Sequence, residues 1–186
     1  MKKTVILLLA IIMLTMAGCS NNKPDISTSS AAESKGTADR MDYEFYIESL
    51  NFYMDSFVDA NEKQIEASDK LNQAASEEDI DFEELKKAYN LCISALEDFY
   101  ELSCPENIKT EHDEFIAQIE TEKKICELML RQIYFEENKE TLTDAEKEEQ
   151  TAVTEQLSEL LTSDENTPTL WELRNRVVDA AYKYCG

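Results

Sequence analysis

DYEFYIESLNFYMDSFVDANEKQIEASDKLNQAA, residues 42–75, is the stretch that decides the fold. Its apolar and small side chains recur at alternating steps of four and three residues, which is the stripe a helix uses to pack into a bundle. We therefore expect a long helix over 42–75. The residues of this core stripe are Tyr46, Leu50, Tyr53, Phe57, Ala60, Gln64, Ala67, Leu71 and Ala74.

Two further segments carry the same spacing. A second helix is predicted over about 82–102, with Asp81 and Glu84 in the positions of a capping box at its start. Pro105 ends this helix, because proline lacks the backbone N–H that a helix needs. A third helix is predicted over about 106–137.

The C-terminal part begins with a second capping box, formed by Thr143 and Glu146. A helical pattern follows, is interrupted over residues 163–168, and starts again at Thr169 and Glu172. The pattern fits one broken fourth helix or a fourth and a fifth helix, and the sequence leaves both open.

Composition supports an all-α fold. Glycine and proline number three each among 186 residues, and hairpins and sheets need more turn residues than that. Short connections place neighbouring helices antiparallel. We predict an up-and-down antiparallel bundle of four to five helices, built as one domain from residues 41–186.

The N-terminus has the layout of a secretory signal. Lys2 and Lys3 precede an apolar run over residues 5–13, and small residues then lead to Met16-Ala17-Gly18-Cys19. These last four residues resemble the lipobox of bacterial lipoprotein precursors. The resemblance implies that residues 1–18 are a signal peptide and that Cys19 becomes the lipidated N-terminus.

Residues 19–40 are polar and rich in serine and threonine, so they cannot bury enough apolar surface to fold. We interpret them as a flexible tether between the lipid on Cys19 and the helical domain. The chain is then anchored to the extracytoplasmic side of a bacterial cell membrane. Ser20 after the lipid cysteine, with a composition rich in Lys, Asn and Glu, favours a Gram-positive cell.

Charge limits the partners. The formal net charge is −22, and it becomes −24 without the signal peptide, whose only charges are Lys2 and Lys3. Such a field repels nucleic acid and anionic head groups and favours basic peptides or protein surfaces. The same charge also fits a simpler role in keeping the domain soluble.

His112 is the only histidine. A carboxylate-bridged metal site in a bundle needs Glu-x-x-His on facing helices, but the residue three before His112 is Lys109. A nucleophilic enzyme would also have to use this one imidazole as its base. We therefore expect a core histidine, no metal site, no cofactor and no catalytic residues, so the protein is predicted not to be an enzyme.

Four cysteines follow Cys19, and none forms a CxxC pair. Antiparallel helices bring Cys104 and Cys185 to one end of the bundle, which makes a disulfide between them possible. If the second and third helices run antiparallel and mirror each other about Pro105, Cys92 on the second helix lies opposite residue 118 on the third. Cys126 would then lie about 12 Å further along the axis, so Cys92 and Cys126 are expected to be separate buried thiols.

Six aromatic residues fall between Tyr43 and Phe57. Phe45 and Phe52 are seven residues apart and lie about 100° from the core stripe at Tyr46 and Tyr53. Either a neighbouring helix covers these two rings or they form a partner-binding face.

We predict a non-enzymatic lipoprotein that acts as an interaction or scaffold module for another envelope protein or peptide. The alternative is a module that binds a small ligand or a cation. An exposed face at Phe45 and Phe52 favours a protein partner, whereas an enclosed polar pocket near Gln64 and Glu122 favours a ligand.

The first testable prediction concerns the anchor. Cys19→Ala should abolish lipidation and normal processing, because it removes the thiol that the lipid modifies. Mass spectrometry of the wild-type protein should find an acylated Cys19 at the mature N-terminus. An unmodified Cys19, or cleavage at another position, would contradict the lipoprotein interpretation.

Overall fold

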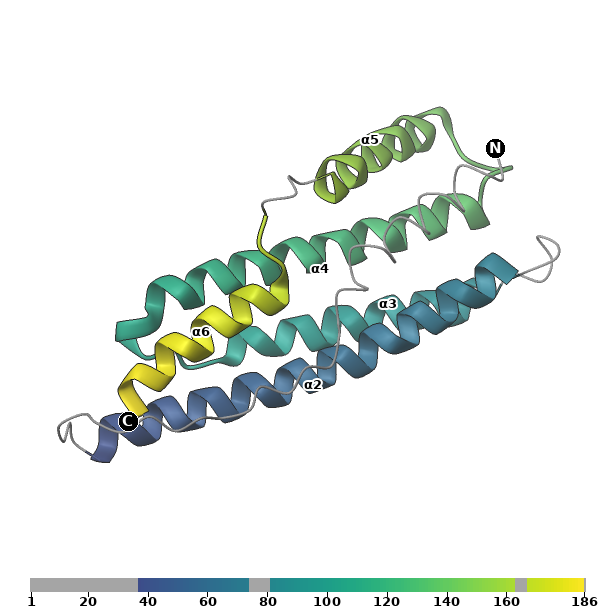
Figure 1. Ribbon diagram of the computed structural model, residues 1–186. Coiled ribbons are helices and arrows are strands. Elements are labelled where there is room, and N and C mark those ends of the chain that lie inside the picture. Colours follow the sequence, from purple (N-terminus) through teal and green to yellow (C-terminus); the bar gives the residue numbers. More distant parts are fainter. Residues whose placement is uncertain (1–36, 74–80, 163–166, 186) are drawn as a thin grey trace.

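The computed structural model describes residues 37–73, 81–162 and 167–185 (Figure 1). Within these ranges the chain forms five α-helices and two short 3-10 segments, with no strand. The predicted all-α bundle is therefore confirmed. The predicted signal peptide, residues 1–18, and Cys19 lie outside the described residues.

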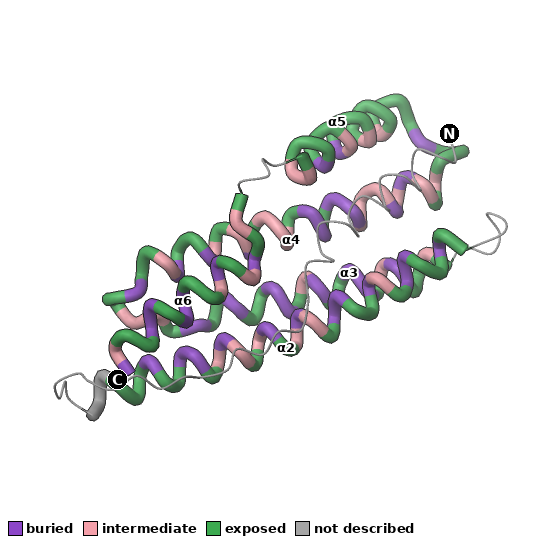
Figure 2. Tube along the Cα trace, viewed as in Figure 1, coloured by how far each residue is buried: buried purple, intermediate pink, exposed green. Residues whose placement is uncertain are grey.

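Helix α2, Thr37–Gln73, is the longest element. It begins five residues before the predicted start, inside the segment we assigned to the tether, and Arg40 pairs with Glu44 one turn later at 2.9 Å. Figure 2 shows buried residues along the side of α2 that faces the other helices. Of the predicted core stripe, Tyr46, Leu50, Phe57, Ala60, Gln64, Ala67 and Leu71 are buried, Tyr53 is half-buried, and Ala74 lies outside the described residues.

Helix α3, Phe82–Glu97, packs antiparallel on α2. Asp81 caps it as predicted, since its carboxylate accepts a hydrogen bond of 3.0 Å from the Glu84 backbone N–H. The Glu84 side chain does not complete the capping box, because its carboxylate forms an ion pair with Lys70 of α2. The helix was predicted to end at about 102, but α3 ends at Glu97 and a 3-10 segment, η2, follows over Asp98–Glu101.

Helix α4, Lys109–Glu137, follows a second 3-10 segment, η3, over Glu106–Ile108. Our register for α3 against α4 was wrong. Cys92 and Cys126 are buried free thiols, as expected, but they are close enough that Cys126 lowers the pKa of Cys92 and Cys92 raises that of Cys126. Lys123 of α4 pairs with Glu97 of α3 at 2.6 Å. Residues of α3 and α4 that lie opposite each other are therefore centred on position 109 or 110, the midpoint of each of these pairs. The sequence-based prediction places this centre at Pro105.

The connection between α3 and α4 explains the difference. Residues 98–108 form no tight turn, because two 3-10 segments flank the extended residues Leu102 and Pro105. The chain continues past the end of α3 before α4 begins. The start of α4 therefore extends past the end of α3, and there the His112 side chain shares a hydrogen bond with Tyr46 of α2.

The C-terminal part forms two separate helices, α5 over Asp144–Leu161 and α6 over Leu170–Cys185. Thr143 and Glu146 exchange hydrogen bonds as a complete capping box at the start of α5. Thr169 and Glu172 do the same at the start of α6. Of the two alternatives left open by the sequence, the one with separate fourth and fifth helices is therefore confirmed.

These two helices pack differently. Among the described elements α5 contacts α4 alone, whereas α6 lies between α2 and α4 (Figure 1). Arg131 holds α5 to α4 through two hydrogen bonds of 2.6 and 2.7 Å to Glu149. At the other end of the bundle Tyr43 of α2 stacks on Tyr184 of α6, with ring centres 4.9 Å apart.

None of the helices within the described ranges combines the length and the apolar character that a bilayer crossing requires.

The second prediction concerns the cap of α5. Hydrogen bonds from Thr143 and Tyr134 lower the pKa of Glu146 to about 2. Because the folded-state pKa lies below the ordinary value, this stabilisation is present above about pH 4.5 and is lost as the pH falls toward 2. Glu146→Ala should lower the melting temperature at pH 7, and its difference from the wild type should narrow between pH 4.5 and 2.

Glu148→Ala is the matched control, since Glu148 is exposed on the same turn and lies outside the capping box. Thermal melts of both variants across this pH range test the prediction. Equal effects of the two substitutions at pH 7 would show that the capping box does not stabilise α5.

Candidate functional site

Three large apolar side chains lie exposed along one face of α2. Met41, Phe45 and Phe52 are each 67% exposed, and their spacing of four and seven residues puts them on one side of the helix. We call this the outer face of α2. The alternative that a neighbouring helix buries Phe45 and Phe52 is excluded for the described helices.

The outer face is open because the neighbours of α2 are placed elsewhere. Tyr53 is directed to η2, the 3-10 segment that follows α3, where its ring meets Phe99 with centres 5.8 Å apart. Asn51 is directed to α6, where it accepts a hydrogen bond from Arg174. Phe45 and Phe52 lie on the remaining side, and the Phe52 ring contacts the Tyr53 ring edge-on, with centres 5.8 Å apart.

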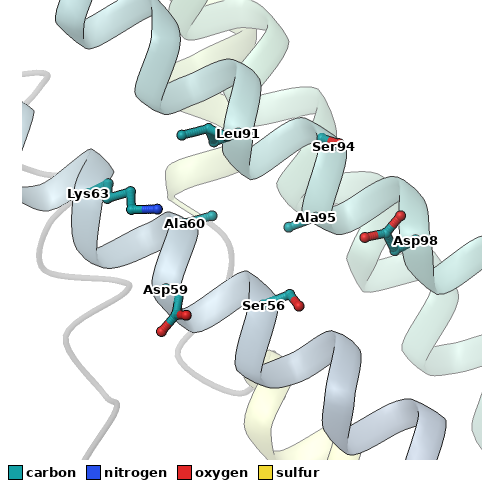
Figure 3. Close-up of a pocket in the computed structure, with 8 residues that line it drawn as sticks. All are labelled: Ser56, Asp59, Ala60, Lys63, Leu91, Ser94, Ala95 and Asp98. Carbon is teal, nitrogen blue, oxygen red and sulfur yellow. The ribbon is translucent and has the colours of Figure 1, made fainter.

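Two shallow hollows follow one another along this side of the molecule. The first, of about 270 Å³, is lined by Phe45, Glu48, Ser49, Phe52 and Tyr53. The second, of about 280 Å³, begins one turn further and lies between α2 and α3 (Figure 3). We call it the α2/α3 groove, and its lining residues are Ser56, Asp59, Ala60, Lys63, Leu91, Ser94, Ala95 and Asp98.

Acidic groups dominate the rim of both hollows. Glu48, Asp59 and Asp98 line them and form no ion pair with any cation of the described residues, while Lys63 is the only cation in the two linings. An apolar surface rimmed by free carboxylates suits an apolar ligand that carries positive charge.

His112 is buried, as predicted, and lies away from the outer face. Its Nδ1 and the Tyr46 hydroxyl are 2.8 Å apart and share a hydrogen bond. Burial lowers the pKa of His112, and burial also raises the pKa of Tyr46. Both groups therefore stay uncharged at neutral pH, so this pair joins α2 to α4 as a neutral structural contact.

Gln64 and Glu122 are not joined to each other. The Gln64 amide donates to Ser68 at 3.0 Å and to the Tyr89 hydroxyl at 3.1 Å. The half-buried Glu122 accepts instead from Gln118 at 2.9 Å, and burial raises its pKa. Gln64 and Glu122 therefore bond to different partners within the bundle and do not converge on one point.

Cys104 and Cys185 reach the same end of the bundle, because α6 runs back to the start of α2 and contacts η3. Both are free thiols in the structure, so the bridge is not formed there and stays a prediction. Burial raises the pKa of Cys104 to about 11, which makes this thiol a weak nucleophile at neutral pH.

The groove residues of α3 were not foreseen from the sequence. Leu91 is 38% exposed and, with Ser94 and Ala95 of α3 and Asp98 of η2, follows a helical spacing of its own. The available signal was Leu91, a large apolar residue placed beside the core stripe of α3 instead of on it. Only the packing of α3 on α2 turns that residue into part of a groove.

Among the described residues, no group of three or more histidine, cysteine or carboxylate side chains could hold a metal ion.

Comparison with protein-family models, with curated proteins and with solved structures gives no match to this chain. The candidate site therefore depends on geometry and charge alone: an exposed aromatic face on α2 that continues into an acidic groove.

The third prediction tests whether the outer face is exposed in solution. Phe45→Ala with Phe52→Ala should change the free energy of unfolding by no more than about 0.5 kcal/mol, as surface substitutions do. Phe99→Ala, at a ring with 0% exposure, should cost about 3–5 kcal/mol. Urea titrations followed by circular dichroism measure both. A loss for the double variant as large as for Phe99→Ala would show that the two rings belong to the core.

Proposed function

We propose that this protein is a non-enzymatic lipoprotein of the bacterial envelope that docks another envelope protein through the outer face of α2. Its lipid on Cys19 anchors it to the membrane, and residues 20–36 let the bundle reach a partner. The anchor follows from the resemblance of residues 16–19 to a lipobox.

The observation that carries this proposal is the exposure of Phe45 and Phe52 on one side of a well-packed helix. Aromatic side chains contribute most of the binding energy in protein interfaces. Clustered exposed aromatic rings are also costly for a monomer, because they promote nonspecific association. A partner that covers Met41, Phe45 and Phe52 would account for their position.

The contacts of the polar core argue against the small-ligand or cation alternative. That function needs an enclosed pocket with convergent polar groups. Gln64 uses its amide on Ser68 and Tyr89, and Glu122 bonds to Gln118. The two hollows described above lie instead on the outside of α2 and are shallow.

The fourth prediction tests docking in living cells. A photoreactive phenylalanine analogue at Ser49, between Phe45 and Phe52 on the outer face, should cross-link to one envelope protein. Phe45→Ala with Phe52→Ala in the same chain should reduce that adduct at least tenfold, because it removes the aromatic anchors. Adducts are measured by mass spectrometry after purification of the labelled chain.

Tyr182→Ala is the matched control, since Tyr182 is an aromatic residue 51% exposed on α6. It should leave the Ser49 adduct unchanged, and the same analogue at Glu155 on α5 should not capture that protein. An adduct that survives loss of both phenylalanines would contradict docking through the outer face.

A further inference from the structure

The outer face and the α2/α3 groove form one continuous surface. At 100° per residue, Phe45, Phe52, Ser56, Asp59 and Lys63 all point within about 40° of one direction from the axis of α2. From position 45 to position 63 this stripe runs about 27 Å at 1.5 Å per residue. Its length matches one helix of about 18 residues lying along α2.

The groove end of this surface is shaped for close approach. Ala60 of α2 and Ala95 of α3 face each other across its floor (Figure 3), and Ser56 and Ser94 add small side chains on either side. Leu91 offers an apolar contact at 38% exposure. Helices pack with the ridges of one in the grooves of the other, and small residues here leave room for the ridge of a third helix.

Charge selects the kind of helix. Glu48, Asp59 and Asp98 are free of ion pairs within the described part of the chain, and they outnumber Lys63, the one cation that lines the two hollows. Free carboxylates beside the apolar contacts of Phe45, Phe52 and Leu91 complement lysine or arginine side chains that flank an apolar stripe.

We infer that the partner binds as a cationic amphipathic helix, whose apolar stripe covers Phe45 and Phe52 and then enters the α2/α3 groove. This inference rests on the proposed function and names the chemistry of the partner. A second copy of this chain fits poorly, because it would set Glu48, Asp59 and Asp98 against an equally acidic surface. An anionic lipid surface is disfavoured for the same reason.

The test uses a designed probe. The probe is a labelled peptide of about 18 residues with a leucine and alanine stripe flanked by lysines, titrated by fluorescence anisotropy against the full chain in neutral lipid nanodiscs. The comparison peptides are a scrambled form, which loses the stripe, and a form with glutamate in place of lysine. Empty nanodiscs give the background.

Charge reversal in the groove should change the preference. Asp59→Lys with Asp98→Lys should weaken binding of the cationic helix at least tenfold and strengthen binding of the acidic one. The matched control, Asp69→Lys with Glu155→Lys, makes the same change in net charge at exposed positions outside the groove. It should change the dissociation constant of the cationic helix less than threefold.

Three results would overturn the inference. The first is equal weakening by the two charge-reversal variants, because binding would then follow net charge alone. The second is equal binding of the scrambled or acidic peptide to the wild type. The third is self-association in analytical ultracentrifugation that Asp59→Lys with Asp98→Lys changes, which would make a second copy the occupant.

None of these results would remove a Ser49 adduct that depends on Phe45 and Phe52. Failure of the cationic-helix inference is therefore distinguishable from failure of docking through the outer face.

Discussion

The structure depends on one constraint: α2 carries two apolar stripes, and its neighbours can cover only one of them. The core stripe packs against α3 and α6, where Leu50 and Phe57 are almost completely buried. That burial supplies the hydrophobic stabilisation on which the bundle is assembled. The second stripe is the outer face of α2, formed by Met41, Phe45 and Phe52, and none of the described helices covers it. The candidate site therefore lies on the same helix that contributes the core stripe.

The other helices keep this division in place. The buried hydrogen bonds of Gln64 to Ser68 and Tyr89 join α2 to α3, and the Tyr46–His112 bond joins α2 to α4. A satisfied buried network favours one arrangement over its alternatives, because a slipped register would leave polar groups unpaired. The rotation of α2, and with it the direction of Phe45 and Phe52, is therefore fixed by contacts on its opposite side. Docking needs such a rigid support, since a preorganised surface loses less entropy on binding.

Local features could be predicted from the sequence and tertiary ones could not. The caps at Asp81, Thr143 and Thr169 were predictable, because each is decided within one turn of helix. The position of Cys92 against Cys126 was not, because it depends on how far residues 98–108 run before α4 begins. The exposure of Phe45 and Phe52 was left open for a related reason: periodicity gives a side chain its direction, but the path of α6 decides which direction is covered.

The most direct test of the two-stripe account is the solvent accessibility of individual phenylalanine rings. Fluorine NMR of the protein labelled with fluorophenylalanine, titrated with a soluble gadolinium chelate, measures it for each of the seven rings. We predict strong paramagnetic broadening at Phe45 and Phe52 and almost none at Phe99 and Phe115, whose exposure is 0%. Equal protection of all four resonances would contradict the account, because the second stripe of α2 would then be covered within the protein itself.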